Sequence, residues 1–590
     1  MPNRIPPCQP DHFTNHDRLR QEILDFAGSP SGCAEPKIAV LTGPPGIGKT
    51  ALALVTAQAL AEPGLRLHAR LDIDPEAPGS VSDALAELLA DLGMAPIPNR
   101  LAARTRAFRT RTVGRPVLLV IDGASTAAQV RALLPAEGLV LVTEARPLSL
   151  DARSFALPPL DADASRALLA QYATAEPELV EQVVELAEGV PLLLRIAGAL
   201  LARPDRPAIV EDILTSAHQT LGEAARRCYR AIALPGTTAE IGIDALTVAL
   251  PDVDVRAAMT DLVTAHLLDE PADGRFRASE LVRRHARGLP ADEDTALRLR
   301  EYYFTRTAAT YRDTGRWPQT ESWFRCPSGT ESVDRAWLDR ERDNIRAALE
   351  HAAAAGEREL VATWCVLLWP YYEHGKHTAD LLATHQLGVR TGNRALRSLL
   401  YTRIGFGHRF AGDLDQAIAA AEQAVDLATE PSLAATALEG LGLVLLAADQ
   451  DDRARTVLRR NLELARRLAE PRRVALACLH DAKVEAPEHA LPLLAEAAPI
   501  FATDPVNLAK TDLWRGRKLT EHRDLDAAHR ALDTALAALR GPFDRAEVHA
   551  ALGDLHRAAG RPDQARDEYA QARAVFEEWG FSQRAARLPN

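Results

Sequence analysis

The sequence predicts a chain of several domains, with a mixed α/β domain in its first third and an all-α superhelix in its last third. Three observations support this prediction. The chain has 590 residues, which is too many for a single hydrophobic core. Apolar runs of strand length alternate with helical segments in the first third. In the last third a helical pattern repeats with a period of about 37 residues.

Composition is that of a globular chain rich in helix-forming residues. Hydrophobic residues make up 47% of the sequence, charged residues 25% and aromatic residues 5%. No apolar run has the length needed to span a bilayer, and the first ten residues lack the apolar core of a secretory signal. The six cysteines form no C-x-x-C pair, which favours reduced thiols over a metal site or disulfides. We therefore expect a cytoplasmic protein without membrane association.

The net charge argues against binding to nucleic acid. The formal charge is −12, and the arginines are interleaved with aspartate and glutamate along the chain. Proteins that hold a phosphate backbone normally carry a basic face or a basic segment. We therefore expect no direct DNA binding.

The most informative stretch runs from Lys37 to Leu60. A short apolar run at residues 38–41 is typical of a buried parallel strand, and residues 51–60 are strong helix formers. Between them lies a full match to the phosphate-loop pattern G-x-x-x-x-G-K-[ST]. This loop consists of Gly43, Pro44, Pro45, Gly46, Ile47, Gly48, Lys49 and Thr50. We expect the loop, together with Ala51 at the start of the helix, to bind ATP or ADP.

The chemistry of phosphate binding requires these residue types. Glycines let backbone N–H groups close around phosphates, and the helix N-terminus adds a partial positive charge. We expect Lys49 to reach the β- and γ-phosphates as a catalytic residue, and Thr50 to bind Mg²⁺. The alternative is a Gly-Pro turn between two core elements, which does not account for the strand and helix on either side.

Two further strands lead to candidate site residues. The run 117–121 ends at Asp122, which we expect to hold Mg²⁺ through water and to act in catalysis. The run 139–143 leads to Arg146, which either senses the γ-phosphate or is a solvated loop charge. Gly123 has no side chain to orient an attacking water, so slow hydrolysis is expected. Alternatively, Gly123 only permits a tight turn and Glu144 orients the water.

In this order, these residues resemble the NB-ARC branch of the STAND NTPases, and most closely the ATPase part of actinobacterial antibiotic-pathway regulators. Six segments carry the resemblance besides the phosphate loop. They are segment 70–78, similar to an L-R-G-Y-D-P stretch, the strand ending Val120-Ile121-Asp122, the helical segment 127–135 after it, the G-L-P-L-like segment 189–192, the segment 275–281 where a Met-His-Asp motif is expected, and the W-L-x-x-E-x-x-N-like segment 337–344. The resemblance implies that Pro191 lies against the adenine.

Departures from the family pattern bear on activity. Gly123 replaces a second acidic residue or an asparagine, and Ser279 stands where the resemblance implies a histidine that contacts the ADP β-phosphate. They argue against efficient hydrolysis and tight retention of ADP, and they leave nucleotide binding supported.

The C-terminal pattern is a repeat of two helices. Small residues recur at Gly405, Gly442, Cys478, Gly516 and Gly553, and bulkier partners or alanine follow sixteen positions later at Ala421, Leu458, Leu494, Leu532 and Tyr569. Small residues are needed where antiparallel helices approach most closely. The array resembles tetratricopeptide repeats, whose concave surface generally binds a peptide or protein partner. The alternative is a purely structural stack.

The sequence thus predicts an α/β P-loop NTPase with a parallel sheet, followed by a helical subdomain, a winged-helix-like module and an all-α tetratricopeptide-type superhelix. The expected boundaries are a lead segment at 1–20, the nucleotide-binding domain at 21–155, the helical subdomain at 156–218, the winged-helix-like domain at 219–290, a helical linker region at 291–395 and the repeats at 396–590.

The expected function is that of a signal-transduction switch and possible slow ATPase. Its nucleotide state would control partner binding or homo-oligomerisation in transcriptional or pathway regulation. The alternatives are an antiviral-type sensor, a nucleotide-binding scaffold with little or no hydrolysis, and an ordinary phosphotransferase or motor.

Overall fold

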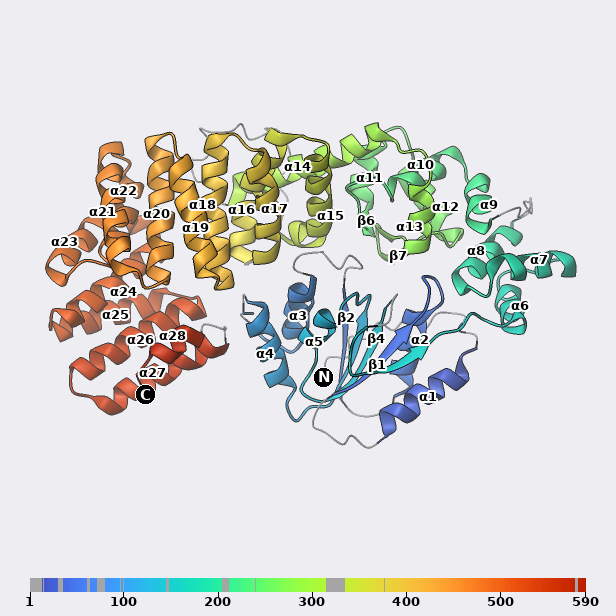
Figure 1. Ribbon diagram of the computed structural model, residues 1–590, viewed down its shortest axis with the longest axis horizontal. Coiled ribbons are helices and arrows are strands. Elements are labelled where there is room, and N and C mark those ends of the chain that lie inside the picture. The colour runs from blue at the N-terminus through green and yellow to red at the C-terminus, as the bar shows by residue number, and fades with distance from the viewer. Residues whose placement is uncertain are drawn as a thin grey trace. The chain divides into compact units, whose positions relative to one another are not determined.

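The computed structural model describes residues 13, 15–29, 36–60, 64–71, 80–95, 97–98, 100–144, 148–203, 212–238, 240–314, 335–375, 377–578 and 582–589 (Figure 1). The chain divides into two compact units. One, here the N-terminal unit, comprises residues 1–94, 108–310 and 329–355, and the other, here the repeat unit, comprises residues 95–107, 311–328 and 356–590. No described helix combines the length and the apolar character that a membrane crossing requires.

The N-terminal unit contains a five-stranded sheet in the order β2-β3-β4-β1-β5, with every neighbouring pair parallel. Its strands are β1 (Lys37–Thr42), β2 (Leu65–Arg70), β3 (Val117–Asp122), β4 (Gly138–Thr143) and β5 (Arg153–Ala156). The three predicted apolar runs form β1, β3 and β4, which confirms the parallel α/β fold. Because all strands run the same way, their carboxyl ends meet at one edge, where ligands bind in open α/β sheets.

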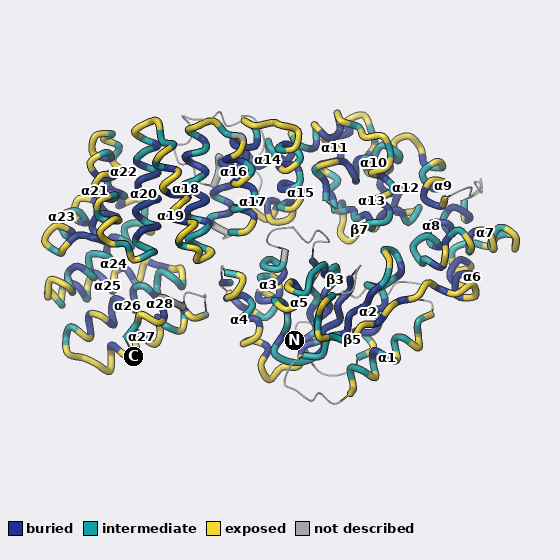
Figure 2. The backbone as a smooth tube through the Cα atoms, in the orientation of Figure 1, coloured by how far each residue is buried: buried dark blue, intermediate teal, exposed yellow. Residues whose placement is uncertain are grey.

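Helices α1 (Asp17–Gly28) and α2 (Lys49–Ala59) pack against the sheet. Ile23 of α1 and Leu52 of α2 are fully buried in one cluster with Leu41 of β1 and Leu141 of β4. Figure 2 shows β3 as a largely buried strand and exposed residues along α1. Helices α3 (Ser80–Asp91) and α5 (Ala127–Ala132) also belong to the N-terminal unit, whereas α4 (Leu101–Thr112) is divided, with residues 101–107 in the repeat unit.

Four helices and then a small mixed module follow the sheet. The helices are α6 (Ala162–Ala170), α7 (Pro177–Ala187), α8 (Pro191–Leu201) and α9 (Ile213–Thr220). The module comprises α10 (Glu223–Ala231), β6 (Glu240–Gly242), α11 (Ile243–Ala249), α12 (Val255–Thr264), β7 (Asp269–Ala272), β8 (Arg275–Arg277) and α13 (Glu280–Arg287). Its three strands form an antiparallel sheet in the order β6-β8-β7.

Two long helices, α14 (Glu293–Thr314) and α15 (Arg335–Ala354), complete the N-terminal unit, and α15 carries the segment 337–344. Two of its side chains join it to the module. Glu341 forms an ion pair with Arg275 of β8 and accepts a 2.8 Å hydrogen bond from Asn344 Nδ2. Asn344 Oδ1 accepts a 2.7 Å hydrogen bond from Thr238 Oγ1. Glu341 and Asn344 are buried, so this polar cluster fixes α15 against the module.

The described part of the repeat unit from residue 356 onward is helical. Its helices are α16 (Arg358–Gly375), α17 (Thr378–Thr391), α18 (Arg394–Ala411), α19 (Leu414–Leu427), α20 (Pro431–Ala447), α21 (Asp451–Leu468), α22 (Pro471–Asp481), α23 (Pro487–Ala497), the 3-10 helix η2 (Ile500–Thr503), α24 (Pro505–Glu521), α25 (Leu525–Ala538), α26 (Pro542–Ala558), α27 (Pro562–Glu578) and α28 (Ser582–Arg587). Helices α22 and α23 have 11 residues each, whereas α20 has 17 and α21 has 18, so the third repeat is shortened.

The predicted small positions lie where paired helices meet. A Cβ atom on Gly442 would lie 2.3 Å from Leu458, and one on Gly553 would lie 2.5 Å from the ring of Tyr569. A Cβ atom on Gly516 would likewise lie 2.6 Å from Leu532. The sixteen-residue spacing found in the sequence therefore joins residues in direct contact, and the tetratricopeptide-type superhelix is confirmed.

Candidate nucleotide-binding site

The phosphate loop connects the carboxyl end of β1 to the first residue of α2. Its glycines Gly43, Gly46 and Gly48 have φ values of 148°, 81° and 99°, which side-chain-bearing residues rarely adopt. At Gly46 a Cβ atom would lie 3.2 Å from the side chains of Val190 and Leu192. The backbone path therefore favours glycine at all three positions, and at Gly46 a close neighbour adds to this requirement.

Segment 189–192 is that neighbour. The amide of Leu192 donates a hydrogen bond of 3.4 Å to the carbonyl oxygen of Gly46. Gly189 has a φ of 67°, and a Cβ atom there would lie 2.3 Å from the carbonyl oxygen of Leu160. Pro191 is the first residue of α8, where its missing N–H costs no helical hydrogen bond. The structure thus places Pro191 beside the phosphate loop.

Lys49 folds back over the loop that precedes it. Its Nζ donates hydrogen bonds of 2.6 Å to the Gly43 carbonyl oxygen and 3.0 Å to that of Pro44. Burial lowers the pKa of Lys49, and the carboxylates of Asp122 and Glu144 oppose that shift. These carbonyl contacts hold the ammonium at the mouth of the loop, where phosphate oxygens could replace them.

Two threonine hydroxyls converge on Asp122 at the end of β3. Thr50 Oγ1 lies 2.8 Å from Asp122 Oδ1, and Thr143 Oγ1 at the end of β4 lies 2.5 Å from the same oxygen. Hydroxyl and carboxylate oxygens suit Mg²⁺, which is usually held by one or two protein ligands together with water and substrate phosphates. In the described residues no three His, Cys, Asp or Glu side chains gather into an all-protein metal cage. The donor set therefore fits a magnesium ion shared with a nucleotide.

Gly123 follows Asp122 in a tight turn. Its φ is 84°, and its amide donates a 3.1 Å hydrogen bond to Thr143 Oγ1. The tight turn explains why glycine occupies position 123. It agrees with the alternative given by the sequence, in which Gly123 permits a turn. It also means that a side chain at this position would strain the backbone.

Glu144 is a buried carboxyl group beside Lys49. It directly follows β4, is 2% exposed, and in the described chain neither of its carboxylate oxygens has a hydrogen-bond partner of ordinary geometry. Burial raises the pKa of Glu144 to about 7, against the opposing effects of the Lys49 ammonium and the Leu148 amide. An unpaired buried carboxyl is costly, and such groups concentrate at functional sites.

Sequence reasoning missed Thr143 and gave Glu144 only as an alternative. A hydroxyl and a carboxyl directly at the end of a central parallel strand were the available signal. Arg146 lies outside the described residues. Ser279 accepts a 3.3 Å hydrogen bond from the Val282 amide and so caps the N-terminus of α13. Its hydroxyl therefore has a local role at the position where the resemblance implies a histidine.

No protein-family model matches the chain. The regulatory protein AfsR of Streptomyces griseus is 25% identical, over 98% of this chain and 69% of that protein. AfsR of Streptomyces coelicolor is 28% identical over 52% of this chain, and that match spans only 36% of the relative's length. A solved STAND protein with a tetratricopeptide repeat sensor from Pyrococcus horikoshii is 13% identical, with a TM-score of 0.47 over 98% of this chain and 96% of that one. The sequence relationship across nearly the whole chain agrees with the loop, sheet and repeats described above: the chain is related to the AfsR regulatory proteins.

Proposed function

We propose that the chain is a nucleotide-dependent switch that binds ATP and ADP with Mg²⁺. Its nucleotide state controls partner binding through the repeats or homo-oligomerisation, in the regulation of transcription or of another pathway. The small module at 219–290 acts as a winged-helix-like domain that transmits the nucleotide state and does not bind DNA.

The observation that carries the proposal is the arrangement around Asp122. Thr50 from the loop and Thr143 from β4 both reach its Oδ1, while Lys49 lies at the mouth of the same loop. Three elements far apart in the sequence thus supply a cation for phosphate and oxygens for a metal. A structural turn between core elements needs none of these contacts.

The residues have separate roles in nucleotide binding. The loop amides and the N-terminus of α2 bind phosphate oxygens, and Lys49 adds charge-assisted hydrogen bonds. Thr50 and Asp122 hold the metal site, where Mg²⁺ would neutralise phosphate charge. Pro191 bounds the loop from the side of α8 and is the candidate for contact with the base.

Hydrolysis is proposed to be slow. Asp122 is occupied with Thr50 and Thr143, and Gly123 has no side chain to orient a water. Glu144 is the remaining buried carboxyl group close to Lys49, and it is the candidate for that task. Loss of a positioned base typically costs about 10²–10⁴-fold in rate.

Mass photometry of the full chain tests the switch. The mass distribution is compared with ADP and Mg²⁺, and with a non-hydrolysable ATP analogue and Mg²⁺. A nucleotide-dependent change in oligomeric mass supports the proposed control of assembly. If calorimetry shows that neither ADP nor the ATP analogue binds, the switch proposal is wrong. The chain would then be a scaffold that uses only its repeats.

A further inference from the structure

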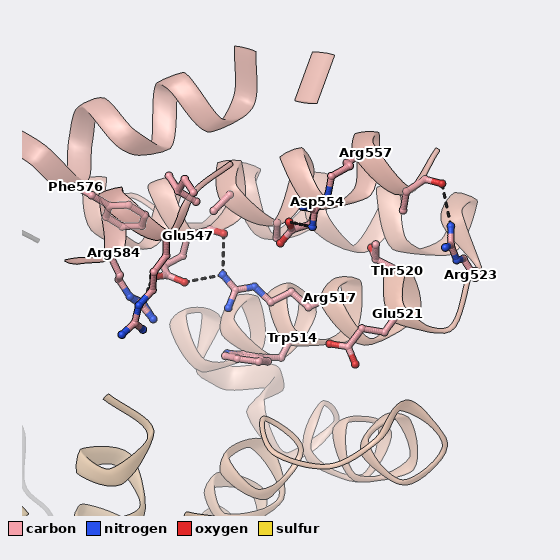
Figure 3. A pocket seen from close by; sticks show the side chains of 15 residues that line it. Trp514, Arg517, Thr520, Glu521, Arg523, Glu547, Asp554, Arg557, Phe576 and Arg584 are labelled. Atoms are coloured by element: carbon pink, nitrogen blue, oxygen red, sulfur yellow. Dashed lines mark hydrogen bonds and ion pairs between the residues drawn. The ribbon is translucent and has the colours of Figure 1, made fainter. Parts of the chain in front are cut away.

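The repeat unit contains a cavity of about 720 Å³. It lies among α24, α26 and α28, and Figure 3 shows side chains from these helices directed into it. Its volume is in the range of ligand-binding pockets. The concave surfaces of helical repeats are where such proteins bind extended partners.

The charge of the cavity is opposite to that of the whole chain. Five arginines and three carboxylates line it, although the chain carries a net charge of −12. One of these arginines, Arg587, is paired with Asp449, which lies outside the lining. Lys483, near the lining residue Trp514, adds a further positive charge. The wall is therefore cationic even after that pair is discounted.

The carboxylates of the wall hold its cations in place. Glu547 accepts a 2.6 Å hydrogen bond from Arg517 and also pairs with Arg584, so one acid serves two guanidinium groups (Figure 3). Asp554 accepts hydrogen bonds from Arg557 at 3.1 Å and from Tyr569 at 2.7 Å. The cationic groups are thus fixed before any ligand binds, which reduces the entropy lost on binding.

Trp514 joins this wall to Lys483. The Arg517 guanidinium lies 4.7 Å from the centre of the Trp514 ring, and Lys483 Nζ lies 5.6 Å from it. No hydrogen bond or ion pair joins Lys483 to any described side chain. Burial, together with the cations Lys510, Arg409 and Arg517, lowers the pKa of Lys483 to about 7, and Glu439 opposes this shift.

We propose that this cavity, with Lys483 and Trp514 at its edge, binds an acidic peptide segment. Its arginines lie on or next to the alternate helices α24, α26 and α28, a spacing that suits several side chains of one extended strand better than a single small anion. The inference rests on the proposed function, in which the repeats bind the partner, and it names the chemistry of that partner. An approaching carboxylate supplies the counter-charge that Lys483 lacks.

Fluorescence anisotropy of a fluorescein-labelled hexaglutamate peptide with the full chain tests the site. Lys483→Met is expected to raise the dissociation constant by about ten- to a hundredfold, because a hydrogen-bonded charge is lost. Lys37→Met is the control, since Lys37 lies on β1 of the N-terminal unit and does not line the cavity. Lys483→Arg keeps the charge and is expected to retain binding.

Several outcomes would overturn the inference. The wild-type chain could fail to bind hexaglutamate, or it could bind labelled hexalysine as tightly as hexaglutamate. A folded Lys483→Met variant could also bind hexaglutamate as tightly as the wild type does. Competition by free glutamate or inorganic phosphate as strong as that by unlabelled hexaglutamate would instead indicate a small-anion site and contradict the peptide. If Lys483→Met does not fold, Arg557→Gln at the exposed rim is expected to weaken binding severalfold, and no change would count against the site. ADP calorimetry on the same variants is expected to match wild type, which separates this test from that of the switch.

Discussion

At the residue scale, the candidate site is defined by where a few side chains meet. Lys49 contacts loop carbonyls, and Asp122 receives two threonine hydroxyls from different elements. These contacts divide the candidate site into a cationic end at Lys49 and an end at Asp122 that is lined by oxygen atoms. The role of single residues in this site can therefore be tested by substitution.

Lys49→Ala is expected to reduce the affinity for both ATP and ADP sharply, by about tenfold or more, without unfolding the chain. Its ammonium supplies charge-assisted hydrogen bonds to phosphate, while Lys49 begins α2 and its side chain is not part of the buried core. Isothermal titration calorimetry measures the affinity, with Lys518→Ala as a control in the other unit. Unchanged ADP binding in a folded Lys49→Ala protein would remove Lys49 from the site.

Glu144→Gln is expected to stabilise the nucleotide-free, Mg²⁺-free chain above neutral pH by about 1–3 kcal/mol, because the neutral amide avoids the cost of burying a charged carboxylate. The folded pKa of Glu144, about 7, lies above its ordinary value of 4.5, so the folded state binds more protons between these values. The contribution of Glu144 to stability is therefore complete below about pH 4.5 and is lost as the pH rises through 7. The melting temperature of Glu144→Gln should therefore exceed that of the wild type by more at pH 8 than at pH 5.

An exposed carboxyl provides the control for that experiment. Glu185 on α7 is exposed, and Glu185→Gln should leave the melting temperature nearly unchanged at both pH values. A stability difference between wild type and Glu144→Gln that does not vary with pH would show that Glu144 is not the titrating group. Single-turnover hydrolysis on the same variant then reports whether Glu144 also orients the attacking water.

The sequence predicted the individual site residues better than their partners. A contiguous motif defines Lys49 and Thr50, and Asp122 ends a recognisable apolar strand. Thr143 could not be assigned to the site because its hydrogen bond to Asp122 depends on the pairing of β3 with β4, which is a tertiary feature. Ser279 looked like a plain departure from a pattern, and only the backbone shows that it begins a helix.

At the element scale, the spacing of small residues predicted which helices touch. The predicted strands formed as expected, but β2 was missed because Arg66, His68 and Arg70 interrupt its apolar pattern. β5 was missed because it has only four residues and lies at the sheet edge. Local patterns therefore predict central strands well and edge strands poorly.

Gly442→Ala is expected to destabilise the repeat unit by about 1–3 kcal/mol, the usual cost of overpacking. The added Cβ would lie 2.3 Å from Leu458, although alanine itself favours the helix by about 1 kcal/mol. Thermal unfolding followed by circular dichroism measures the effect. The double variant Gly442→Ala with Leu458→Ala should show a coupling energy of about 0.5–3 kcal/mol.

Gly541→Ala is a suitable control, because its nearest heavy atom would lie at an ordinary contact distance of 3.4 Å. It should change the melting temperature much less than Gly442→Ala. Strict additivity in the double variant would mean that the Gly442–Leu458 contact does not limit the approach of α20 and α21.

At the scale of the whole molecule, charge separates two kinds of recognition. The chain as a whole is acidic, whereas the cavity among α24, α26 and α28 is cationic. An acidic chain repels a phosphate backbone over distances of about one Debye length, while a local cationic cavity still attracts a short anionic segment.

The full chain is therefore expected to show no specific binding to duplex DNA. A gel mobility shift at about 50 mM and 200 mM salt measures this, because contacts to phosphate weaken steeply over that interval. A shift that depends on DNA sequence and disappears at the higher salt concentration would contradict the prediction. The opposite result is expected for hexaglutamate, which should bind. The two polyanions can therefore be compared directly on the same protein.

The attachment of α15 has a mechanical consequence. Because Glu341 and Asn344 anchor α15 to the module at 219–290, a rotation of that module turns the whole helix as a rigid lever. The lever ends at Ala354, and α16 starts at Arg358 after a short connection in which Gly356 has a φ of 78°. A motion of the module is therefore expected to carry α15 with it as far as Ala354, next to Ala355, where the N-terminal unit ends.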